Sequence, residues 1–446
     1  MTTPSAPDHT TVPSYNQSTI TKDGRNASIS QLVEWMEQKL RLPNKARRFV
    51  VESICPGPSV QACVDPKCTT QLSSNLTTRV RSLLTPPQMF LTDQQHELIL
   101  SLGAGIPESD LVLITAASPD HYDELQALLH NLHEFVYPAL TDFTMVVWDL
   151  GLTTQQRENL EKCCRCHLAR FPFEKFPATF RDVRCYMWKP VVHKASLYYL
   201  YLACINVLPV SCRHHCITCI LQASLYYLIL QASLYYLYLE GITVLPVSCR
   251  HYCITCILKA SLYYLYLEGI TASLYRARKY LIWQDASIRY KKGGHEFFSQ
   301  AEALGLQIMR KDWGEPVAHQ TLPEMFAYMG QPHCAFNQFP EIMSGVGVYK
   351  NEPFIHRAIV EPWARCGMEK NCMCPRDSHR SHYCPKTATN YGHCHRFDQS
   401  ALSILTGTLY NKEVYRVVIQ NWNKYFSVQR NHVEPNYFNS TGCLSN

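Results

Sequence analysis

The chain has 446 residues, of which 46% are hydrophobic, and a formal net charge of +6. This length accommodates one large α/β domain with appendages, or two domains. The positive charge is modest and is not gathered into basic runs, so the composition argues against phosphate-driven binding, and we expect no nucleic-acid partner.

Residues 1–90 are rich in Ser, Thr, Pro and Asn, which predicts a stem that is partly disordered. One amphipathic helix is predicted within it, at SISQLVEWMEQKLRL (28–42). Residues 1–30 contain no apolar stretch of the kind that a signal peptide has. A membrane anchor, if the protein has one, is therefore expected to be missing from this chain.

Helical and strand patterns alternate from residue 91 onward. LTDQQHELIL predicts a helix, and later helices follow Pro119 and the Thr cap of TTQQRENLEKCC. This alternation is typical of a parallel sheet with helices on its faces, in which ligands lie beyond the carboxyl ends of the strands. The predicted strands are DLVLITAAS (110–118), FTMVVWDLGL (143–152), CHLARFPF (166–173) and the strand that opens YLIWQDASIRY (280–290).

A repetitive segment interrupts this pattern at residues 194–275. The units at 194–221 and 231–258 differ at five positions, with truncated copies between and after them. Structural repeats normally diverge, so near-identity with ragged truncation indicates a recent duplication or a gene-model artefact. Two alternatives stay open: a membrane span within the uncharged residues 216–239, and a metal site at the copied cysteines and histidines.

Cysteine usage is high, at twenty-one residues. A C-terminal group lacks the paired spacing of structural zinc sites, which favours disulfides in an oxidising compartment. Four N-x-S/T sequons point the same way, and we expect the Golgi or another secretory-pathway lumen. The C-terminal cysteines are Cys366, Cys372, Cys374, Cys384 and Cys394, and the sequon asparagines are Asn16, Asn26, Asn75 and Asn439.

Six motifs occur in an order that resembles GT-A-type nucleotide-sugar glycosyltransferases, and more closely the GT-A-like animal family called domain of unknown function 1647. The resemblance implies an α/β, GT-A-like (Rossmann-like), mostly parallel sheet with flanking helices, here interrupted by the repetitive insertion. It also implies sugar transfer from a nucleotide-sugar donor to a glycan, protein or lipid acceptor. The motifs are TAAS, VVWDLGL, YMWKPVV, YLIWQDASIRY, EIMSGVGVYKN and CHRFDQSALSIL. The corresponding division is 1–90 stem, 91–193 nucleotide-binding half, 194–275 insertion, 276–430 second half with the Cys-rich segment, and 431–446 tail.

The donor site implied by the resemblance lies at the strand ends. A uracil and ribose pocket is expected from Thr115, Ala116, Ser118 and Asp149, although Asp149 could instead cap the following helix. Trp283 is a further candidate beside the donor, with core packing as its alternative. Lys189 or Arg289 could neutralise the donor phosphates.

A metal site is a second expectation at WQDAS. GT-A enzymes usually hold a divalent cation with an Asp-x-Asp after a strand, since hard cations prefer oxygen ligands. Here Asp285 takes the place of the first acid and Ser287 that of the second. Mn²⁺ or Mg²⁺ would therefore be held less well, and capping or ion pairing is the alternative for Asp285.

Catalytic roles are expected for Asp285, Glu341 and Asp398, and the resemblance implies that Asp398 and Gln399 lie either at the acceptor side or beside the donor sugar. Glu341 precedes a run of small residues and is a candidate general base. Asp398 lies near the start of a predicted helix, where N-capping is its simpler explanation. Two other classes of function remain open: a GT-A-like binding protein without turnover, and a zinc-dependent interaction protein.

Overall fold

The computed structural model describes residues 28–41, 71–197, 279–310, 316–381, 384, 392–419, 421–430 and 432–441. The predicted insertion lies outside the described residues apart from its first positions, and so does much of the predicted stem. Asn16 and Asn26 also lie outside them.

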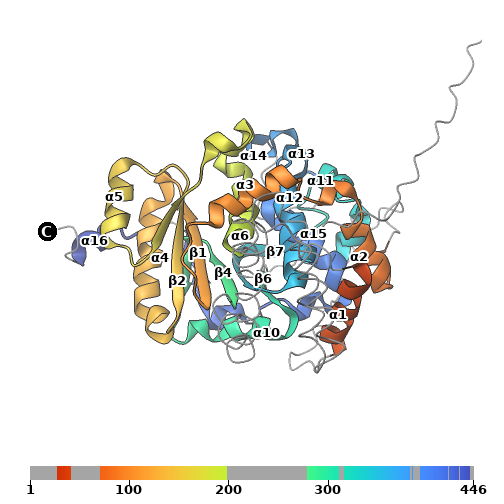
Figure 1. Cartoon of the computed structure of the whole chain (residues 1–446), viewed down its shortest axis with the longest axis horizontal. Helices are drawn as coiled ribbons and strands as arrows, with labels where there is room; N and C mark the ends of the chain where they lie inside the picture. The colour runs from red at the N-terminus through yellow and green to blue at the C-terminus, as the bar shows by residue number, and fades with distance from the viewer. Residues whose placement is uncertain are drawn as a thin grey trace, which may run out of the picture.

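The described part is a mixed α/β structure built on a central six-stranded sheet (Figure 1). The strand order is β3-β2-β1-β4-β7-β6. β3, β2, β1 and β4 run parallel, whereas β7 is antiparallel to both β4 and β6. The predicted mostly parallel sheet with flanking helices is therefore confirmed. The strands are β1 (Leu111–Ala117), β2 (Phe143–Asp149), β3 (His167–Arg170), β4 (Tyr280–Gln284), β6 (Leu306–Arg310) and β7 (Ile342–Lys350), with β5 (Ile288–Tyr290) and β8 (Phe426–Val428) in a separate antiparallel pair.

The strands are nearly continuous apolar runs because both faces of the sheet are covered. In β1, Val112 and Ile114 join one core cluster, whereas Leu113 between them joins the other. Figure 1 shows α4 on one side of the sheet and α6, α12 and α15 on the other. The molecule is thus layered as helix, sheet and helix.

Local sequence signals explain several helix boundaries. Thr92 and Thr153 each form a capping box at the start of their helices, with Gln95 and Gln156 as the reciprocal partners. The α-helices are α1 (Ile29–Arg41), α2 (Leu76–Leu84), α3 (Asp93–Gly103), α4 (Tyr122–Phe135), α5 (Thr154–Cys163), α6 (Trp188–Leu197), α10 (Ala301–Leu304), α11 (Pro323–Tyr328), α12 (Glu361–Gly367), α13 (Lys370–Met373), α14 (Ser378–Ser381), α15 (Phe397–Tyr410) and α16 (Tyr437–Ser440). Among the described residues, no helix is both long enough and apolar enough to cross a membrane.

The structure refines two boundaries of the predicted domains, the end of the stem and the start of the repetitive segment. The helix predicted at 28–42 is α1, and its Leu32 and Met36 are buried in the larger core cluster rather than standing apart from it. Ala195 and Leu197, which open the repeat unit in the sequence, are buried residues at the end of α6. The ordered fold therefore reaches a few positions into the repetitive segment.

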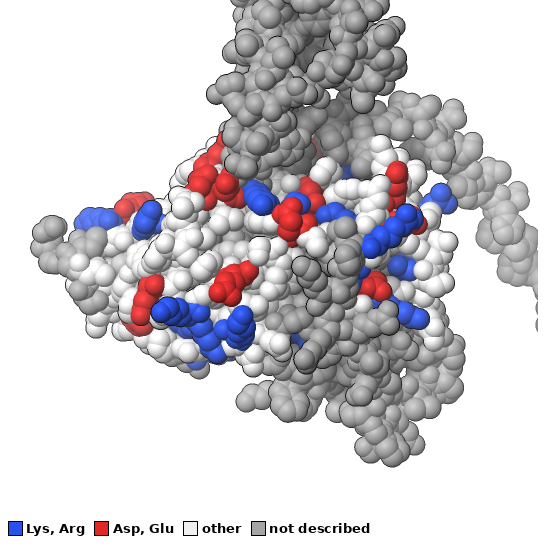
Figure 2. Space-filling view, turned by 90° about the horizontal axis from the view of Figure 1, so that it is seen from below, with Lys and Arg blue, Asp and Glu red and all other residues white. Residues whose placement is uncertain are grey.

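Charged side chains of both signs are interspersed on the face seen from below (Figure 2).

Four disulfides lie within the described part, and three of them take up all five of the C-terminal cysteines. The bonds are Cys164–Cys166, Cys185–Cys374, Cys366–Cys372 and Cys384–Cys394.

Candidate functional site

Asp285 lies directly after β4, at the edge of the sheet where the parallel strands β1 and β2 also end. Its backbone N–H donates to the carbonyl of Gly345 on β7, at 2.8 Å, and its own carbonyl accepts from Ile288 N at 3.0 Å. The backbone is therefore held on both sides of the acid. The Asp285 side chain is 37% exposed, so its carboxylate can meet a ligand.

Lys189 connects Asp285 to a second acid. Its ammonium Nζ lies 2.9 Å from Asp285 Oδ1, 3.2 Å from Asp398 Oδ2 and 3.1 Å from Ser344 Oγ. The Ser344 hydroxyl also donates to Asp398 Oδ2. The four residues come from α6, the turn after β4, β7 and α15, which converge here from distant parts of the chain. We call Lys189, Asp285, Ser344 and Asp398 the lysine cluster.

The charges of the lysine cluster are enclosed to different extents. The side chains of Lys189 and Asp398 are 3% and 4% exposed, so the interior acid and the lysine are closed off from solvent. Burial alone would lower the pKa of Lys189, but the carboxylates of Asp285 and Asp398 outweigh it and raise that pKa above its ordinary value. Lys189 therefore stays charged, and Asp285 is the one acid of the cluster that reaches the surface.

The Trp283 side chain contacts two members of the lysine cluster, Lys189 and Asp285. The Lys189 ammonium lies 4.6 Å from the centre of the Trp283 ring, and Trp283 Nε1 donates to Asp285 Oδ1 at 2.8 Å. The ring is 2% exposed and packs against His193 and Trp188. The structure thus places Trp283 as a support for Asp285 within the core.

Two aromatic residues next to the cluster adopt left-handed backbone conformations. Tyr186 has φ 53°, just before α6, and Phe397 has φ 51°, immediately before Asp398. Their rings lie 5.7 Å apart. A positive φ is costly for an aromatic residue, and such strain tends to gather at functional sites. Both strained residues position a charged member of the cluster.

The donor set at Asp285 fits a divalent cation poorly. Oδ1 already accepts from Lys189 Nζ and Trp283 Nε1. A second cation on the same carboxylate would face the lysine charge, and repulsion between unit charges about 4 Å apart costs on the order of 4 kcal/mol near a protein surface. Ser287 is half-buried and adds one neutral oxygen. Mn²⁺ or Mg²⁺ would have to overcome the repulsion from Lys189 with few free oxygen ligands.

The residues predicted for a nucleoside pocket lie along β1 and after it. Thr115 is buried, and its hydroxyl has no hydrogen-bond partner among the residues that the structure describes. Ala116 is half-buried, and Ser118 is buried with its hydroxyl donating to Asp120. These positions share the carboxyl edge with Asp285, as the sequence predicted for the end of this strand.

Asp149 is fully engaged in structure at the end of β2. Its Oδ1 accepts from the backbone N–H groups of Gly151, at 2.8 Å, and Leu152, at 2.6 Å, while Oδ2 accepts from Arg157 Nε at 2.8 Å. The side chain is 1% exposed. These contacts fit an acid that holds the turn after the strand, but the expected capping role is wrong, because Thr153 is the N-cap of α5.

Glu341 and Gln399 meet at Arg396. Arg396 Nε lies 3.2 Å from Glu341 Oε1 and 3.2 Å from Gln399 Oε1. Glu341 is 1% exposed, whereas Gln399 is half-buried. A buried, paired carboxylate is poorly placed to take a proton from an acceptor, so this geometry suits a positioning role for Glu341.

Sequence reasoning missed three features of this region. Arg289, considered for phosphate binding, donates to the carbonyls of Ala286 and Ile288 instead. Asp398 makes no N-cap hydrogen bond, because Arg396 is the N-cap of α15 and has no side-chain cap bond. The central position of Ser344 was not expected either, although the run of small residues on β7 was the available signal.

Comparisons with known proteins give limited matches. The chain matches a family described as a protein of unknown function (DUF1647) over residues 79–194, so the expected family resemblance is confirmed for that segment. Mouse xyloside xylosyltransferase 1, in its apo form, is similar at 13% identity over 68% of this chain and 82% of its own, with a TM-score of 0.28. A likeness this weak says nothing of what the chain does. No curated protein matches.

Proposed function

We propose that the protein is a glycosyltransferase that moves a sugar from a nucleotide-sugar donor to a glycan, protein or lipid acceptor. The observation that carries the proposal is Asp285: a surface-reaching carboxylate, held by Lys189 and Trp283, at the carboxyl edge of a parallel sheet. Open α/β sheets bind ligands at this edge. The motif order that resembles GT-A enzymes supports the same assignment.

In this proposal Asp285 accepts hydrogen bonds from hydroxyl groups of the donor. Ala116 and Ser118 line the nucleoside side, Thr115 is buried beside them, and Asp149 holds the turn after β2. Glu341 and Asp398 position their partners Arg396 and Lys189 rather than exchange protons, because both acids are buried and paired. The reaction does not depend on a metal ion held tightly by Asp285 and Ser287, since that donor set fits a divalent cation poorly.

The proposed compartment is the Golgi or another lumen of the secretory pathway. Pairing of all five C-terminal cysteines supports an oxidising environment. Asn75 and Asn439, the two sequon asparagines in the described part, are both exposed. Glycans could join either side chain without entering the core.

A binding protein without turnover is the second candidate. The observation that favours it is the balance within the lysine cluster, where one ammonium already contacts both acids. An enzyme needs interactions that strengthen in the transition state. A cluster whose charges already satisfy each other is better suited to holding a ligand.

The test is a panel of UDP-, GDP- and CMP-sugars offered to the full chain, with and without Mn²⁺. Donor hydrolysis or transfer that Asp285→Asn abolishes supports the enzyme, and binding of a donor without turnover supports the second candidate. The absence of both binding and turnover across the panel would remove both. Activity that requires Mn²⁺ and is lost on substitution of Asp285 or Ser287 would refute the proposal that the reaction does not depend on a metal ion at these two residues.

A further inference from the structure

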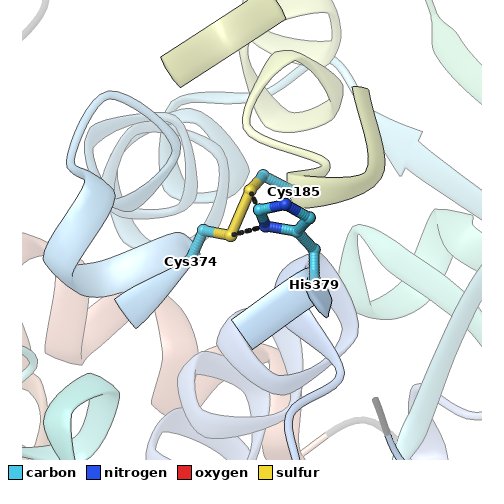
Figure 3. A group of neighbouring side chains, drawn as sticks. All are labelled: Cys185, Cys374 and His379. Atoms are coloured by element: carbon cyan, nitrogen blue, oxygen red, sulfur yellow. Dashed lines mark hydrogen bonds between the residues drawn. A yellow bond between two sulfur atoms is a disulfide. The ribbon is translucent and has the colours of Figure 1, made fainter. Parts of the chain in front are cut away.

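A group of metal-binding side chains lies apart from the lysine cluster. Cys185 ends a short 3-10 helix, η8 (Val183–Cys185), Cys374 follows α13, and His379 lies on α14. One ligand atom from each falls within 4.8 Å of the others (Figure 3). Within the described residues, these three form the one group of this kind. The two cysteines are joined as a disulfide.

The histidine is placed as a ligand would be. His379 Nδ1 lies 3.1 Å from Cys185 Sγ and 3.4 Å from Cys374 Sγ, and Figure 3 shows the ring facing both sulfurs. Zinc bonds of about 2.3 Å to sulfur and 2.0 Å to nitrogen imply nitrogen–sulfur separations of about 3.5 Å in a tetrahedral site. The imidazole therefore needs little movement, and the main change is separation of the two sulfurs once their bond is broken.

A carboxylate fixes the orientation of this ring. His379 Nε2 lies 2.6 Å from Asp182 Oδ2, a separation that requires a proton between the two atoms. Arg380 Nε donates to the same nitrogen at 3.0 Å, so Asp182 and Arg380 compete for Nε2. In the tautomer that pairs with Asp182, Nε2 carries the proton and the lone pair of Nδ1 faces the sulfurs. A histidine that ligates a metal through one nitrogen and donates to a carboxylate through the other is the usual arrangement at zinc.

The side chains of the group are largely buried. Cys185 and Cys374 are 3% and 0% exposed, and the His379 side chain is 3% exposed. A polar imidazole enclosed against two sulfurs contributes little to a disulfide, which has no charge to neutralise. The same imidazole has a definite use beside two thiolates, the form in which cysteine binds metals.

We propose that reduction of the Cys185–Cys374 disulfide creates a Zn²⁺ site made of both thiolates and His379, with Asp182 as the carboxylate that orients the histidine. A dithiol reductant breaks the sulfur–sulfur bond and is itself oxidised to a disulfide, leaving two cysteine thiols. Zn²⁺ then displaces the two thiol protons, and water completes the coordination. A small-molecule disulfide that re-forms the Cys185–Cys374 bond is itself reduced to two thiols, and the ion is released. The site is independent of the proposed sugar transfer.

The experiment uses the full chain in two states, as purified with its disulfides and after anaerobic reduction by a dithiol. Zinc is added, and alkylation of each cysteine is followed peptide by peptide. In the reduced protein, zinc should slow alkylation of Cys185 and Cys374 at least tenfold. His379→Ala, which retains both cysteines, should lose that protection, and Asp182→Asn should weaken zinc binding about 10- to 100-fold.

Cys366 and Cys372 supply the matched control, since they form another disulfide of the same region. Cys366→Ser should leave the zinc protection of Cys185 and Cys374 unchanged. The number of zinc ions retained against a chelator should fall by one in His379→Ala relative to the reduced reference protein. Equal protection with and without zinc, or protection that survives His379→Ala, would overturn the proposal. So would equal zinc retention by the oxidised and reduced proteins.

Discussion

The ammonium of Lys189 lies 2.9 Å from the carboxylate of Asp285, although the two residues are 96 positions apart in the sequence. Lys189 precedes the repetitive segment in the sequence, and Asp285 follows it. Because Lys189 also contacts Asp398, the position of Asp285 at the sheet edge depends on three parts of the chain at once. Substitution of one charged residue at a time can therefore show which charge supports activity and which supports folding.

Asp285→Asn should remove activity with little loss of stability. The amide keeps an oxygen that can accept from Lys189 and Trp283, but the surface charge disappears. Loss of one preorganised electrostatic contact costs roughly 3–4 kcal/mol in the transition state, a hundredfold or more in rate. Donor hydrolysis and thermal melting should be measured together.

Asp149→Ala is the matched control, because this acid is buried and holds two backbone N–H groups and Arg157. It should lower the free energy of unfolding by about 1–3 kcal/mol, the cost of unsatisfied buried donors. An Asp285→Asn protein that unfolds, or that retains full turnover, would contradict the assignment of Asp285.

Lys189→Met should destabilise the protein strongly. Without the ammonium, the buried Asp398 loses its positive partner, and breaking a buried pair in this way typically costs about 3–5 kcal/mol. Denaturant unfolding of the single variant and of Lys189→Met with Asp398→Asn should show partial recovery in the double variant. A single variant as stable as the reference protein would mean that the lysine cluster contributes nothing to folding.

The stabilisation from Lys189 should vary with pH in the alkaline range. Its pKa is raised in the folded protein by the two carboxylates, against the effect of burial. The stabilisation is therefore complete below the unfolded pKa of about 10.4 and is lost as pH rises through the higher folded value. The difference in unfolding free energy between the reference protein and Lys189→Met should be constant from neutral pH upward and shrink only above about pH 10. A difference that shrinks near neutral pH would show a different origin.

Deletion of residues 199–275 tests whether the repetitive segment belongs to the fold. Residues 195–198 and 272–275 have the same sequence, ASLY, so this deletion keeps the buried end of α6 and rejoins it to the strand β4 through RARK. The shortened chain should melt cooperatively and at least as high as the full chain. Deletion of 195–275 is the informative control, because it also removes Ala195 and Leu197 from α6 and should cost stability. Loss of the cooperative transition in both would place the segment in the core.

Asn75 tests the compartment. Its side-chain Oδ1 caps α2 by accepting from Thr78 N at 2.9 Å, which leaves the amide nitrogen, the atom that a glycan joins, outside that bond. In material secreted from animal cells, Asn75→Gln should remove one glycan and increase mobility on a gel. Thr77→Ala should give the same shift while keeping the cap. Identical mobility of both variants and the reference protein would argue against glycosylation here.

The local elements were predictable because their signals are local. The apolar runs before Ser118 and Asp149 gave β1 and β2, and the capping box at Thr153 gave the start of α5. The lysine cluster was only partly predictable: Lys189, Asp285 and Asp398 were candidates, but their mutual contact depends on packing between distant elements. The antiparallel insertion of β7 between β4 and β6, which brings Ser344 to the centre, has no local signature.

The disulfide between Cys185 and Cys374 spans a sequence separation of 189 residues and therefore bridges the stretch 198–278. A protease that cut the backbone anywhere in this stretch would produce two fragments still linked through sulfur. On a denaturing gel the nicked protein would run as one band without reductant and as two bands with it. β4 would meanwhile keep its hydrogen bonds to β1 from the other fragment. An unbroken peptide chain between α6 and β4 is thus not needed to keep the two halves together, and the molecule could persist as a two-chain protein.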